Sequence, residues 1–483
     1  MTPHFQGDVH IFYGPPGTGK THELINNLDG LLKRGYKPNE IAYTSFTREG
    51  TNQGVRRACQ QFGYSRKDTP YMRTWHSLAF HALDLKKDQV IGPEHYRMFG
   101  DAIGMNFLGF YSGDFHSPDD RYLFFVDLLR NNKEAALRYL ETLDYSIAQY
   151  VSIAYRTFKD TFKLLDFTDM IMQYVARGEP LPVRAAILDE VQDFTTLHWQ
   201  MAEIALANCE EIYIAGDDDQ AIYQWSGADV HAFMNIEGKK QVLAKSHRLP
   251  RSVLALSKTI TEQISLRIPK EYDAKDAEGS VSYVGDFADV SLTLPGRYMF
   301  LARNNKFLTK IEEYLRASGI LYETKDGLSI SLVDIESIKL WEGYCNGGEL
   351  SHSQEMRVKQ AIADDAVFKA RKLHWSDAFG SWDAEKRDYA QLIVKRYGYD
   401  IADQCITRVS TIHTVKGAEA ENVILYLGMS RMTWLDYQAN MDAEHRVFYV
   451  GVTRASENLF IVLGDERFNY ELYPETVKET ATC

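Results

Sequence analysis

The loop "GPPGTGKT", residues 14–21, restricts the possible folds of this chain more than any other segment. The short apolar run "VHIFY" precedes the loop. A helix is predicted after it, because apolar side chains recur at helical spacing at Leu24, Ile25, Leu28, Leu31 and Leu32. A strand, a glycine-rich loop and a helix in this order match the pattern GxxxxGK[ST] in the context that a phosphate-binding loop needs. The segment therefore predicts an α/β fold with a nucleotide-binding loop after its first strand.

The chemistry of this loop assigns roles to its residues. Backbone N–H groups and the N-terminus of the following helix are suited to hold phosphate oxygens. Lys20 is expected to neutralise the β and γ oxygens of a nucleotide, and the Thr21 hydroxyl is expected to coordinate Mg²⁺. The predicted nucleotide-binding residues of the loop are Gly14, Pro15, Pro16, Gly17, Thr18, Gly19, Lys20 and Thr21.

The segment "VRAAILDEVQDF" supplies a second element of a phosphate site. Residues 183–188 form an apolar run that is typical of a buried strand in a parallel sheet, and such sheets bind ligands at the carboxyl ends of their strands. Asp189 is predicted to enter the magnesium shell, and Glu190 is predicted to activate the attacking water. The alternative for two adjacent acids is a solvated loop. Hydrolysis is favoured over phosphoryl transfer to another substrate.

A third apolar run, "EIYIAG", leads into "GDDDQAIYQWSGA", residues 216–228. The three aspartates Asp217, Asp218 and Asp219 cannot be buried together without partners, because an unpaired buried charge is very costly. Their place after a strand predicts that they emerge at the same sheet edge as the nucleotide. From the residues alone, Trp225 fits either core packing or ligand binding.

Length and composition indicate a folded chain of several domains. The 483 residues, with 45% hydrophobic and 25% charged side chains, predict two to four domains. No apolar run approaches the roughly 20 residues of a membrane span, and the N-terminus lacks the pattern of a signal peptide. A cytoplasmic location and no membrane partner are therefore expected. The five cysteines form no CxxC pair, so a zinc site or an iron–sulfur cluster is not indicated.

The formal net charge of -13, taken alone, argues against a polyanionic partner such as nucleic acid. The segment from Thr44 to Arg73, however, contains six cationic residues and only two anionic residues. The field of a groove is set within a Debye length of about 8 Å, so the charge of the whole chain does not decide its ligand. This cluster fits either a solvated basic face or part of an anion-binding groove.

Eight motifs together carry a resemblance to a known family. In chain order they are "GPPGTGKT", "YTSFTR", "TWHSLAF", "ILDEVQDF", "GDDDQAIYQWSGA", "KSHRLP", "TIHTVKGAEAENVIL" and "YVGVTRA". Their order resembles that of the superfamily 1A helicases, the UvrD, Rep and PcrA group, from Gly14 to Arg454. The resemblance implies an α/β fold of two RecA-like P-loop motor lobes with parallel sheets, each interrupted by a mainly helical insertion.

The motif positions predict how these lobes divide the chain. The first lobe is expected at residues 1–80 and 165–240, with a helical insertion at 81–164. The second lobe is expected at residues 241–345 and 405–483, with a small second insertion at 346–404 in which Trp375 and Trp382 are anchors.

The resemblance also implies ATP and Mg²⁺ as cofactors and assigns further catalytic positions. Gln220 corresponds to a sensor of the γ-phosphate. Arg248 and Arg454 correspond to two arginines that reach the γ-phosphate from the second lobe, where two cations would stabilise charge that develops in the transition state. Glu419 corresponds to an acid that couples ATP to the strand. The predicted catalytic residues are Lys20, Asp189, Glu190, Gln220, Arg248 and Arg454.

For the nucleic-acid partner, the resemblance implies that Trp225 stacks on a base of single-stranded DNA and that Tyr223, also assigned to DNA binding, packs between Gln220 and Trp225. Phe46 corresponds to a base-contacting aromatic. The other predicted strand-contacting positions are Thr74, His76, Arg303, Asn305, Thr411 and His413. For each polar residue alone, a capping or surface role remains open.

The sequence departs from the family near the adenine. The family has a glutamine element about twenty residues before the P-loop lysine, but only nineteen residues precede Lys20, and Gln6 is a poor substitute. His22 and His247 stand where the family places an arginine and a tyrosine that sandwich the base. Two imidazoles stacked on the adenine, or two exposed histidines, are the alternatives. Ser226 replaces a usual arginine.

The expected function is that of an ATP-dependent helicase that moves 3′ to 5′ on single-stranded DNA and unwinds duplex junctions. A helicase of this kind could act together with replication, repair or recombination proteins. One alternative is an ATP-switched single-strand binding protein that strips other proteins or controls recombination without unwinding. Another is a P-loop ATPase that acts on no nucleic acid.

A wedge at the fork is expected after the last motif, where the family has an aromatic-tipped hairpin. The segment "NLFIVLGDERFNYELY" lies there, with a turn signal at Gly464 and Asp465 and with Tyr470 as the candidate wedge. The alternative is that residues 459–463 form the last strand of the sheet and that Tyr470 packs against it.

Overall fold

The chain folds into two compact units in a computed structural model. The structure describes residues 2–45, 51–52, 55–56, 59–60, 63–108, 110–111, 114–115, 117–362, 364–464 and 467–472. The first unit comprises Met1–Glu278 and Tyr437–Thr453, and the second comprises Gly279–Asp436 and Arg454–Cys483. Each unit is built on a mainly parallel sheet, which confirms the predicted α/β fold class.

The first unit contains a five-stranded sheet in the order β2-β5-β6-β1-β7, in which all neighbouring strands are parallel. The strands are β1 (Asp8–Tyr13), β2 (Ile41–Ser45), β5 (Ala185–Asp189), β6 (Glu211–Gly216) and β7 (Lys239–Val242). Because the strands are parallel, the segments that follow β1, β5 and β6 all leave from the same edge. These segments carry the P-loop, the acids of "LDEVQDF" and the three aspartates.

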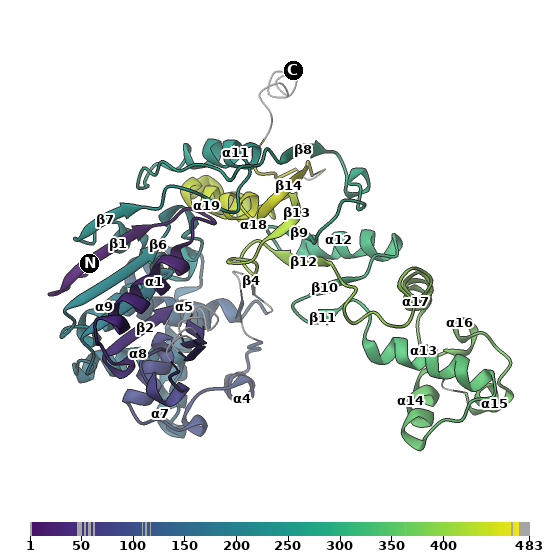
Figure 1. Cartoon of the computed structure of the whole chain (residues 1–483). Helices are drawn as coiled ribbons and strands as arrows, with labels where there is room; N and C mark the ends of the chain where they lie inside the picture. The colour runs from purple at the N-terminus through teal and green to yellow at the C-terminus, as the bar shows by residue number, and fades with distance from the viewer. Residues whose placement is uncertain are drawn as a thin grey trace. The chain divides into compact units, whose positions relative to one another are not determined.

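Helices cover both faces of this sheet (Figure 1). Alternate side chains of β1 point to opposite faces, so Phe12 packs with Leu24 and Leu28 of α1 (Lys20–Lys33), while Ile11 packs in the cluster on the other face. That second cluster includes apolar side chains of three helices, which are α3 (Trp75–Ala82), α8 (Phe167–Arg177) and α9 (Thr196–Ala205). The sheet is thereby buried on both faces, as a parallel sheet requires.

The predicted insertion at residues 81–164 is mainly helical and has a hydrophobic cluster of its own. A short antiparallel pair of strands accompanies the helices. The elements are α4 (Pro93–Ile103), β3 (Phe110–Tyr111), β4 (Asp114–Phe115), α5 (Asp120–Asn131), α6 (Lys133–Leu140) and α7 (Tyr145–Phe162).

The first unit extends beyond the predicted first lobe. It takes in residues 241–278 and 437–453, which the motif positions predict for the second lobe. These segments contribute α11 (Arg251–Thr261) and α19 (Met441–Val452), and the short helix α10 (Val230–Met234) precedes them. Asp442 of α19 accepts hydrogen bonds from the backbone N–H groups of Ser265 and Leu266 at 2.9 and 3.1 Å, and these bonds help to join the two segments.

The second unit contains a seven-stranded sheet in the order β11-β10-β12-β9-β13-β14-β8. Only the β10–β11 pair is antiparallel. The strands are β8 (Ser280–Val284), β9 (Tyr298–Ala302), β10 (Tyr322–Thr324), β11 (Gly327–Leu328), β12 (Thr407–Thr411), β13 (Ala420–Tyr426) and β14 (Ala455–Val462). Two further helices are α12 (Lys306–Ala317) and α18 (Arg431–Ala439).

The predicted second insertion, residues 346–404, forms a helical group beside α13 (Leu332–Cys345) (Figure 1). Its helices are α14 (His352–Ile362), α15 (Asp365–Ala370), α16 (Trp375–Ala378) and α17 (Ala384–Tyr397). Trp375 and Trp382 are buried in the same hydrophobic cluster as strand residues such as Phe300, so this group shares one core with the sheet. Among the described helices of the whole chain, none is long and apolar enough to cross a membrane.

Candidate functional site

The P-loop connects the carboxyl end of β1 to the start of α1. Lys20, the first residue of α1, donates a hydrogen bond from Nζ to the carbonyl oxygen of Gly14 at 2.7 Å and lies 4.0 Å from the Glu190 carboxylate. Gly17 has a φ of 72°, and a Cβ at that position would lie 2.3 Å from Cβ of Arg248. The turn of the loop therefore requires glycine there, both for its backbone conformation and for space.

The carboxylate of Asp189, at the end of β5, accepts a hydrogen bond from the Thr21 hydroxyl at 3.0 Å and from the backbone N–H of Glu190 at 2.9 Å. Burial, and then the charge of Glu190, raises the pKa of Asp189 to about 7, although Lys20 opposes this shift. A hydroxyl beside a carboxylate fits Mg²⁺, which prefers oxygen ligands and commonly takes only one or two carboxylates in addition to substrate phosphates.

Glu190 has an unusual backbone and a constrained side chain. Its φ of 55° lies in the left-handed region, which a non-glycine residue adopts at an energetic cost and which is frequent at functional sites. The Gln192 amide donates a hydrogen bond to the Glu190 carboxylate at 2.5 Å, and its oxygen accepts one from the backbone N–H of Asp217 at 3.1 Å. Gln192 therefore connects the predicted general base to the segment after β6.

The three aspartates after β6 are buried and paired. Lys270, whose side chain has no exposed surface, lies 3.1 Å from the Asp217 carboxylate and 2.9 Å from that of Asp219, and it also contacts Asp218. Arg267 makes two hydrogen bonds to Asp219, at 2.9 and 2.6 Å. The sequence predicts that these acids need partners, and cations from a segment distant in the sequence supply them. The acids and cations form an ion cluster within the first unit.

Gln220, the predicted γ-phosphate sensor, is attached to this cluster. Its side-chain amide donates a hydrogen bond to Asp217 Oδ2 at 2.6 Å. Arg446 of α19 donates from Nε to the carbonyl oxygen of Asp218 at 2.8 Å, and this bond holds the backbone of the same turn. The orientation of Gln220 therefore depends on groups far from it in the sequence.

Trp225 lies at the other end of this segment and stacks on an aromatic ring of the insertion. Its ring centroid is 5.6 Å from that of Phe124 on α5, with an interplanar angle of 29°. Tyr139 packs edge-on against Phe124 at 5.0 Å, and Tyr223 lies 6.5 Å from Trp225. Asn132 also donates to the carbonyl oxygen of Gly227 at 3.3 Å, so the end of α5 is joined to the turn that carries Trp225.

The segment "KSHRLP" lies against the P-loop within the first unit. Ser246 donates from its hydroxyl to the Pro16 carbonyl oxygen at 2.7 Å, and the backbone N–H of His247 donates to the Gly17 carbonyl oxygen at 2.8 Å. Arg248 follows directly and belongs to the first unit, whereas the family resemblance predicts it on the second lobe. His22 and His247 are both exposed, which is compatible with either of their two proposed roles.

Two predicted strand-contacting residues lie at the start of α3. Thr74 is the N-cap residue of that helix and is half-buried. The His76 ring packs edge-on against Phe167 and His198, with centroids at 5.4 and 5.3 Å, and burial lowers the pKa of His76 to about 4. Phe46, predicted to contact a base, lies outside the described residues.

The remaining predicted residues belong to the second unit. Arg303 and Asn305, which follow β9, are half-buried, and Glu419 is exposed. Thr411 and His413 are buried instead, so the structure does not present their side chains on a surface. The Thr411 hydroxyl lies 2.9 Å from that of Thr414.

The two other predictions in this unit concern Arg454 and Tyr470, and both side chains are buried. Arg454 donates from Nη1 to the Ala418 carbonyl oxygen at 3.0 Å. Tyr470 has no exposed surface, and its backbone N–H donates to the Leu427 carbonyl oxygen at 3.0 Å. This burial favours the packing role that the sequence left open over a wedge at a fork.

Several residues of the site could not be identified from the sequence, among them Gln192, Lys270, Arg267 and Phe124. A partial signal existed for the cations, because three consecutive acids after a buried strand require positive partners. The sequence could not show that "SLRIPK" supplies them. The sequence gives no comparable indication for Phe124, whose position fits a core residue of an amphipathic helix.

Two family models match parts of the chain. The UvrD/REP helicase N-terminal domain matches residues 2–107 and 124–241, and the UvrD-like helicase C-terminal domain matches residues 397–466. The two models together match more than half of the chain.

Individual relatives are distant in sequence. A probable DNA helicase II homolog of Mycoplasma capricolum is 24% identical over 303 residues, which are 56% of this chain and 41% of that protein. ATP-dependent DNA helicase Rep of Escherichia coli is 23% identical and covers 47% of this chain and 37% of Rep. ATP-dependent DNA helicase PcrA of Staphylococcus aureus is 22% identical and covers 55% of this chain and 39% of PcrA. The matches thus span about two fifths of the length of these relatives.

Among solved structures, an arterivirus nonstructural protein 10 helicase aligns with a TM-score of 0.36 at 12% identity, over 95% of this chain and 60% of that one. A similarity this low supports no inference about function. The chain belongs to the UvrD/Rep family of superfamily 1A helicases.

Proposed function

We propose that the protein is an ATP-dependent DNA helicase that translocates 3′ to 5′ on single-stranded DNA. The observation that carries this proposal is the segment 216–228. At one end, Gln220 and Asp217 are hydrogen-bonded to each other and, through Gln192, to Glu190 beside the P-loop. At the other end, Trp225 is supported by Phe124. One short segment can therefore respond to a γ-phosphate and change the position of a base-stacking ring.

For ATP hydrolysis, the residues of the first unit would act on the phosphates and the water. Lys20 would neutralise phosphate oxygens, and Glu190, held by Gln192, would orient the attacking water and accept its proton. Thr21 and Asp189 would hold Mg²⁺, which supplies charge stabilisation at the phosphates. Arg248 is close to Gly17 and would offset charge that develops in the transition state.

For binding of the DNA strand, the face of an aromatic ring suits a motor that must bind any base sequence. Stacking on a ring contributes about 1–3 kcal/mol per base and has little sequence preference. Loss of the γ-phosphate would release Gln220, and a shift in its turn would move Trp225 relative to the base. The 3′ to 5′ direction rests on the family resemblance.

Three assays on the full-length protein test this proposal. ATP hydrolysis is measured with and without oligo(dT), translocation is measured on single strands labelled at either end, and strand separation is measured on 3′-tailed and 5′-tailed duplexes. We expect DNA-stimulated ATPase, arrival at 5′ ends, and ATP-dependent products from the 3′-tailed duplex. Lys20→Ala is the control without hydrolysis.

The possible failures distinguish the alternatives. ATPase that single-stranded DNA does not change would support a P-loop ATPase without a nucleic-acid role. Stimulated ATPase and protein displacement without product strands would support a remodelling protein. Preferential unwinding of 5′-tailed duplexes would overturn the polarity.

A further inference from the structure

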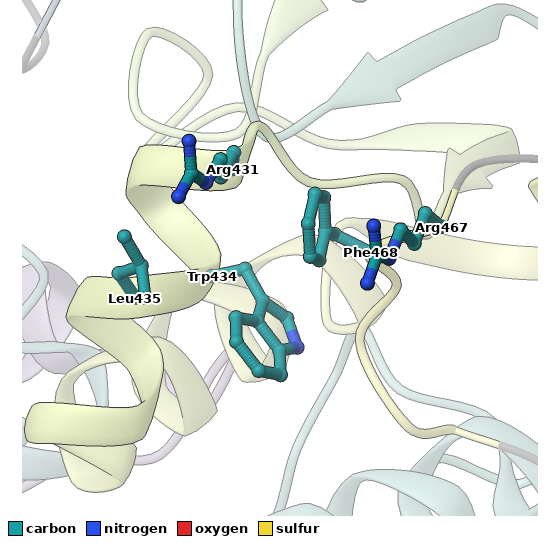
Figure 2. A pocket seen from close by; sticks show the side chains of 5 residues that line it. All are labelled: Arg431, Trp434, Leu435, Arg467 and Phe468. Carbon is teal, nitrogen blue, oxygen red and sulfur yellow. The ribbon is translucent and has the colours of Figure 1, made fainter.

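A pocket of the second unit lies beside residues that the sequence already predicts to contact the strand. It has a volume of about 570 Å³, and Figure 2 shows its lining side chains, which are Arg431, Trp434, Leu435, Arg467 and Phe468. Asn304, between the predicted strand-contacting residues Arg303 and Asn305, donates a hydrogen bond to the Thr433 hydroxyl of α18 at 2.9 Å. The pocket therefore adds no separate site. An unexplained polar group lies instead in the first unit, on β2.

The hydroxyl of Tyr43 is buried and has no hydrogen-bond partner among the described residues. The backbone of Tyr43 is held from both sides. It pairs with Ile187 of β5 on one side. On the other side its carbonyl oxygen accepts a hydrogen bond from the Arg73 N–H at 3.0 Å, and its N–H donates to the Tyr71 carbonyl oxygen at 3.2 Å. Buried polar groups are nearly always paired, so an unpaired hydroxyl at a fixed position indicates a role in binding.

Tyr43 lies on the same face of the sheet as the carboxylate of Asp189. The Tyr43 ring belongs to the cluster that includes Leu24 of α1. Asp189 is two residues beyond Ile187 on β5, so its side chain points to this same face, and the spacings of a sheet place its Cα about 8 Å from that of Tyr43. The hydrogen bond to Asp189 from Thr21, in the first turn of α1, confirms this face. Tyr43 and the two predicted Mg²⁺ ligands are therefore on one side of the sheet.

The charges at this edge of the sheet act on the Tyr43 hydroxyl. Burial, and then the negative charges of Asp189 and of Glu190, raise the pKa of Tyr43 well above its ordinary value. The hydroxyl therefore stays neutral, and its oxygen can accept a hydrogen bond. Mg²⁺ usually keeps several water ligands when a protein holds it through one or two carboxylates and substrate phosphates. Such waters donate hydrogen bonds to nearby oxygen atoms.

We propose that Tyr43 is a positioning residue of the Mg²⁺ site, where its hydroxyl accepts a hydrogen bond from a water ligand of the metal that Thr21 and Asp189 would hold. Groups behind the direct ligands orient them, and loss of such a group commonly weakens metal affinity by about 10–100-fold. The proposal rests on the proposed function, because it takes a site for Mg²⁺ and a nucleotide as given. It adds β2 to a site whose predicted metal ligands come from α1 and β5.

The test uses Tyr43→Phe in the full-length protein, because this change removes the hydroxyl and keeps the ring. Mn²⁺, which substitutes for Mg²⁺ and is detected by electron paramagnetic resonance, is titrated in the presence of ADP. We expect the variant to bind Mn²⁺ roughly tenfold or more weakly than wild type. The Mg²⁺ concentration for half-maximal ATPase should rise by a similar factor.

Two further measurements separate a role at the metal from a role in the fold. The affinity of Tyr43→Phe for ADP in EDTA should equal that of wild type, because the P-loop is unchanged. The unfolding midpoint of the variant without nucleotide should not fall, because no hydrogen bond to a described residue is lost. A lower midpoint would assign the hydroxyl to the fold and overturn the proposal.

Tyr13→Phe is the matched control. The Tyr13 hydroxyl is also buried without a hydrogen-bond partner among the described residues, but its ring packs on the opposite face of the sheet, with Ile11 and Phe233. This variant should bind Mn²⁺ like wild type. Wild-type Mn²⁺ affinity in Tyr43→Phe, or equal weakening in both variants, would overturn the proposal. If wild type itself binds no Mn²⁺ with ADP, the nucleotide site of the proposed function fails.

Discussion

The ammonium group of Lys270 lies 3.1 Å from Oδ1 of Asp217, and the other carboxylate oxygen of Asp217 accepts the hydrogen bond of the Gln220 amide at 2.6 Å. The carboxylate of Asp217 thus links Lys270 to Gln220, the predicted phosphate sensor. Lys270 also contacts Asp218 and Asp219 and has no exposed side-chain surface. Removal of its charge would leave three buried acids with fewer cations and would free the sensor to turn.

We therefore expect Lys270→Met to lower the free energy of unfolding by about 3–5 kcal/mol, as loss of one partner of a buried ion pair does. Chemical denaturation measures this change. Lys239→Met is the matched control, because Lys239 pairs with Asp8 at 3.1 Å on an exposed surface and should cost less than about 1 kcal/mol. Equal losses in the free energy of unfolding would show that the buried ion cluster stabilises the fold no more than an exposed ion pair does.

A second buried network predicts how stability depends on pH. Burial alone would raise the pKa of Asp166, but Arg130 and Lys159, with hydrogen bonds to it at 2.9 and 2.8 Å, outweigh burial and hold the pKa well below its ordinary value. A carboxyl with a lowered folded-state pKa stabilises the fold above its ordinary pKa, and this stabilisation is lost as the pH falls from about 4 through the folded-state pKa. Of the neighbouring acids, Asp169 contacts the same two cations, while Asp127, whose pKa burial raises, acts in the opposite sense.

Asp166→Asn tests this relationship by unfolding at several pH values. The variant should be less stable than wild type at pH 7, and the difference should shrink as the pH falls below about 4, because wild type loses the same charge there. Asp160→Asn, an exposed change on α7, should follow the wild-type curve. A difference that stays constant down to low pH would contradict the proposed ion pairing.

Lys20→Ala is expected to remove ATP hydrolysis and leave single-strand affinity nearly unchanged. The reason is that Lys20 contacts the P-loop and lies near Glu190, while the proposed strand contacts come from other segments. Steady-state ATPase and oligo(dT) anisotropy measure the two properties. Parallel loss of both in a folded variant would assign Lys20 a structural role.

Trp225→Ala is expected to weaken oligo(dT) binding by about 1–3 kcal/mol and to slow translocation, while the basal ATPase without DNA persists. Phe124→Leu should weaken binding in the same direction but less, because it removes the ring behind Trp225 and keeps an apolar side chain in the cluster. Anisotropy titrations compare the two variants. A Phe124→Leu protein with wild-type affinity would show that Trp225 needs no support from the insertion.

Tyr470→Ala should destabilise the second unit and not act on strand separation alone. Tyr470 is fully buried, and removal of a large buried aromatic side chain costs about 3–5 kcal/mol. We expect a lower unfolding midpoint and similar losses in ATPase, translocation and unwinding. Tyr145→Ala, which removes an exposed tyrosine, is the control. Selective loss of unwinding at unchanged stability would restore the wedge role.

Much of the first unit could be predicted because its signals are local. The spacing of Gly14, Gly19 and Lys20, the helical period that follows, and an apolar run ending at Asp189 each depend on a few neighbouring residues. Local backbone preference and burial on one face are sufficient to determine such elements. Thr21 and Asp189, both predicted to hold Mg²⁺, lie within hydrogen-bond distance because the loop after β1 and the end of β5 are at the same edge of one parallel sheet.

The sequence by itself therefore determined the phosphate-binding loop, the two parallel-sheet units and the order of the family motifs. Tertiary structure alone decided that Lys270, Arg267 and Arg446 surround the three aspartates, that Phe124 lies behind Trp225, and that Tyr470 is buried. It also joined residues 241–278 and 437–453 to the first unit. The physical reason is distance along the chain. A buried charge requires a partner and a ring requires a packing surface, but the sequence does not indicate which of many distant residues the folded path will bring within 3–6 Å.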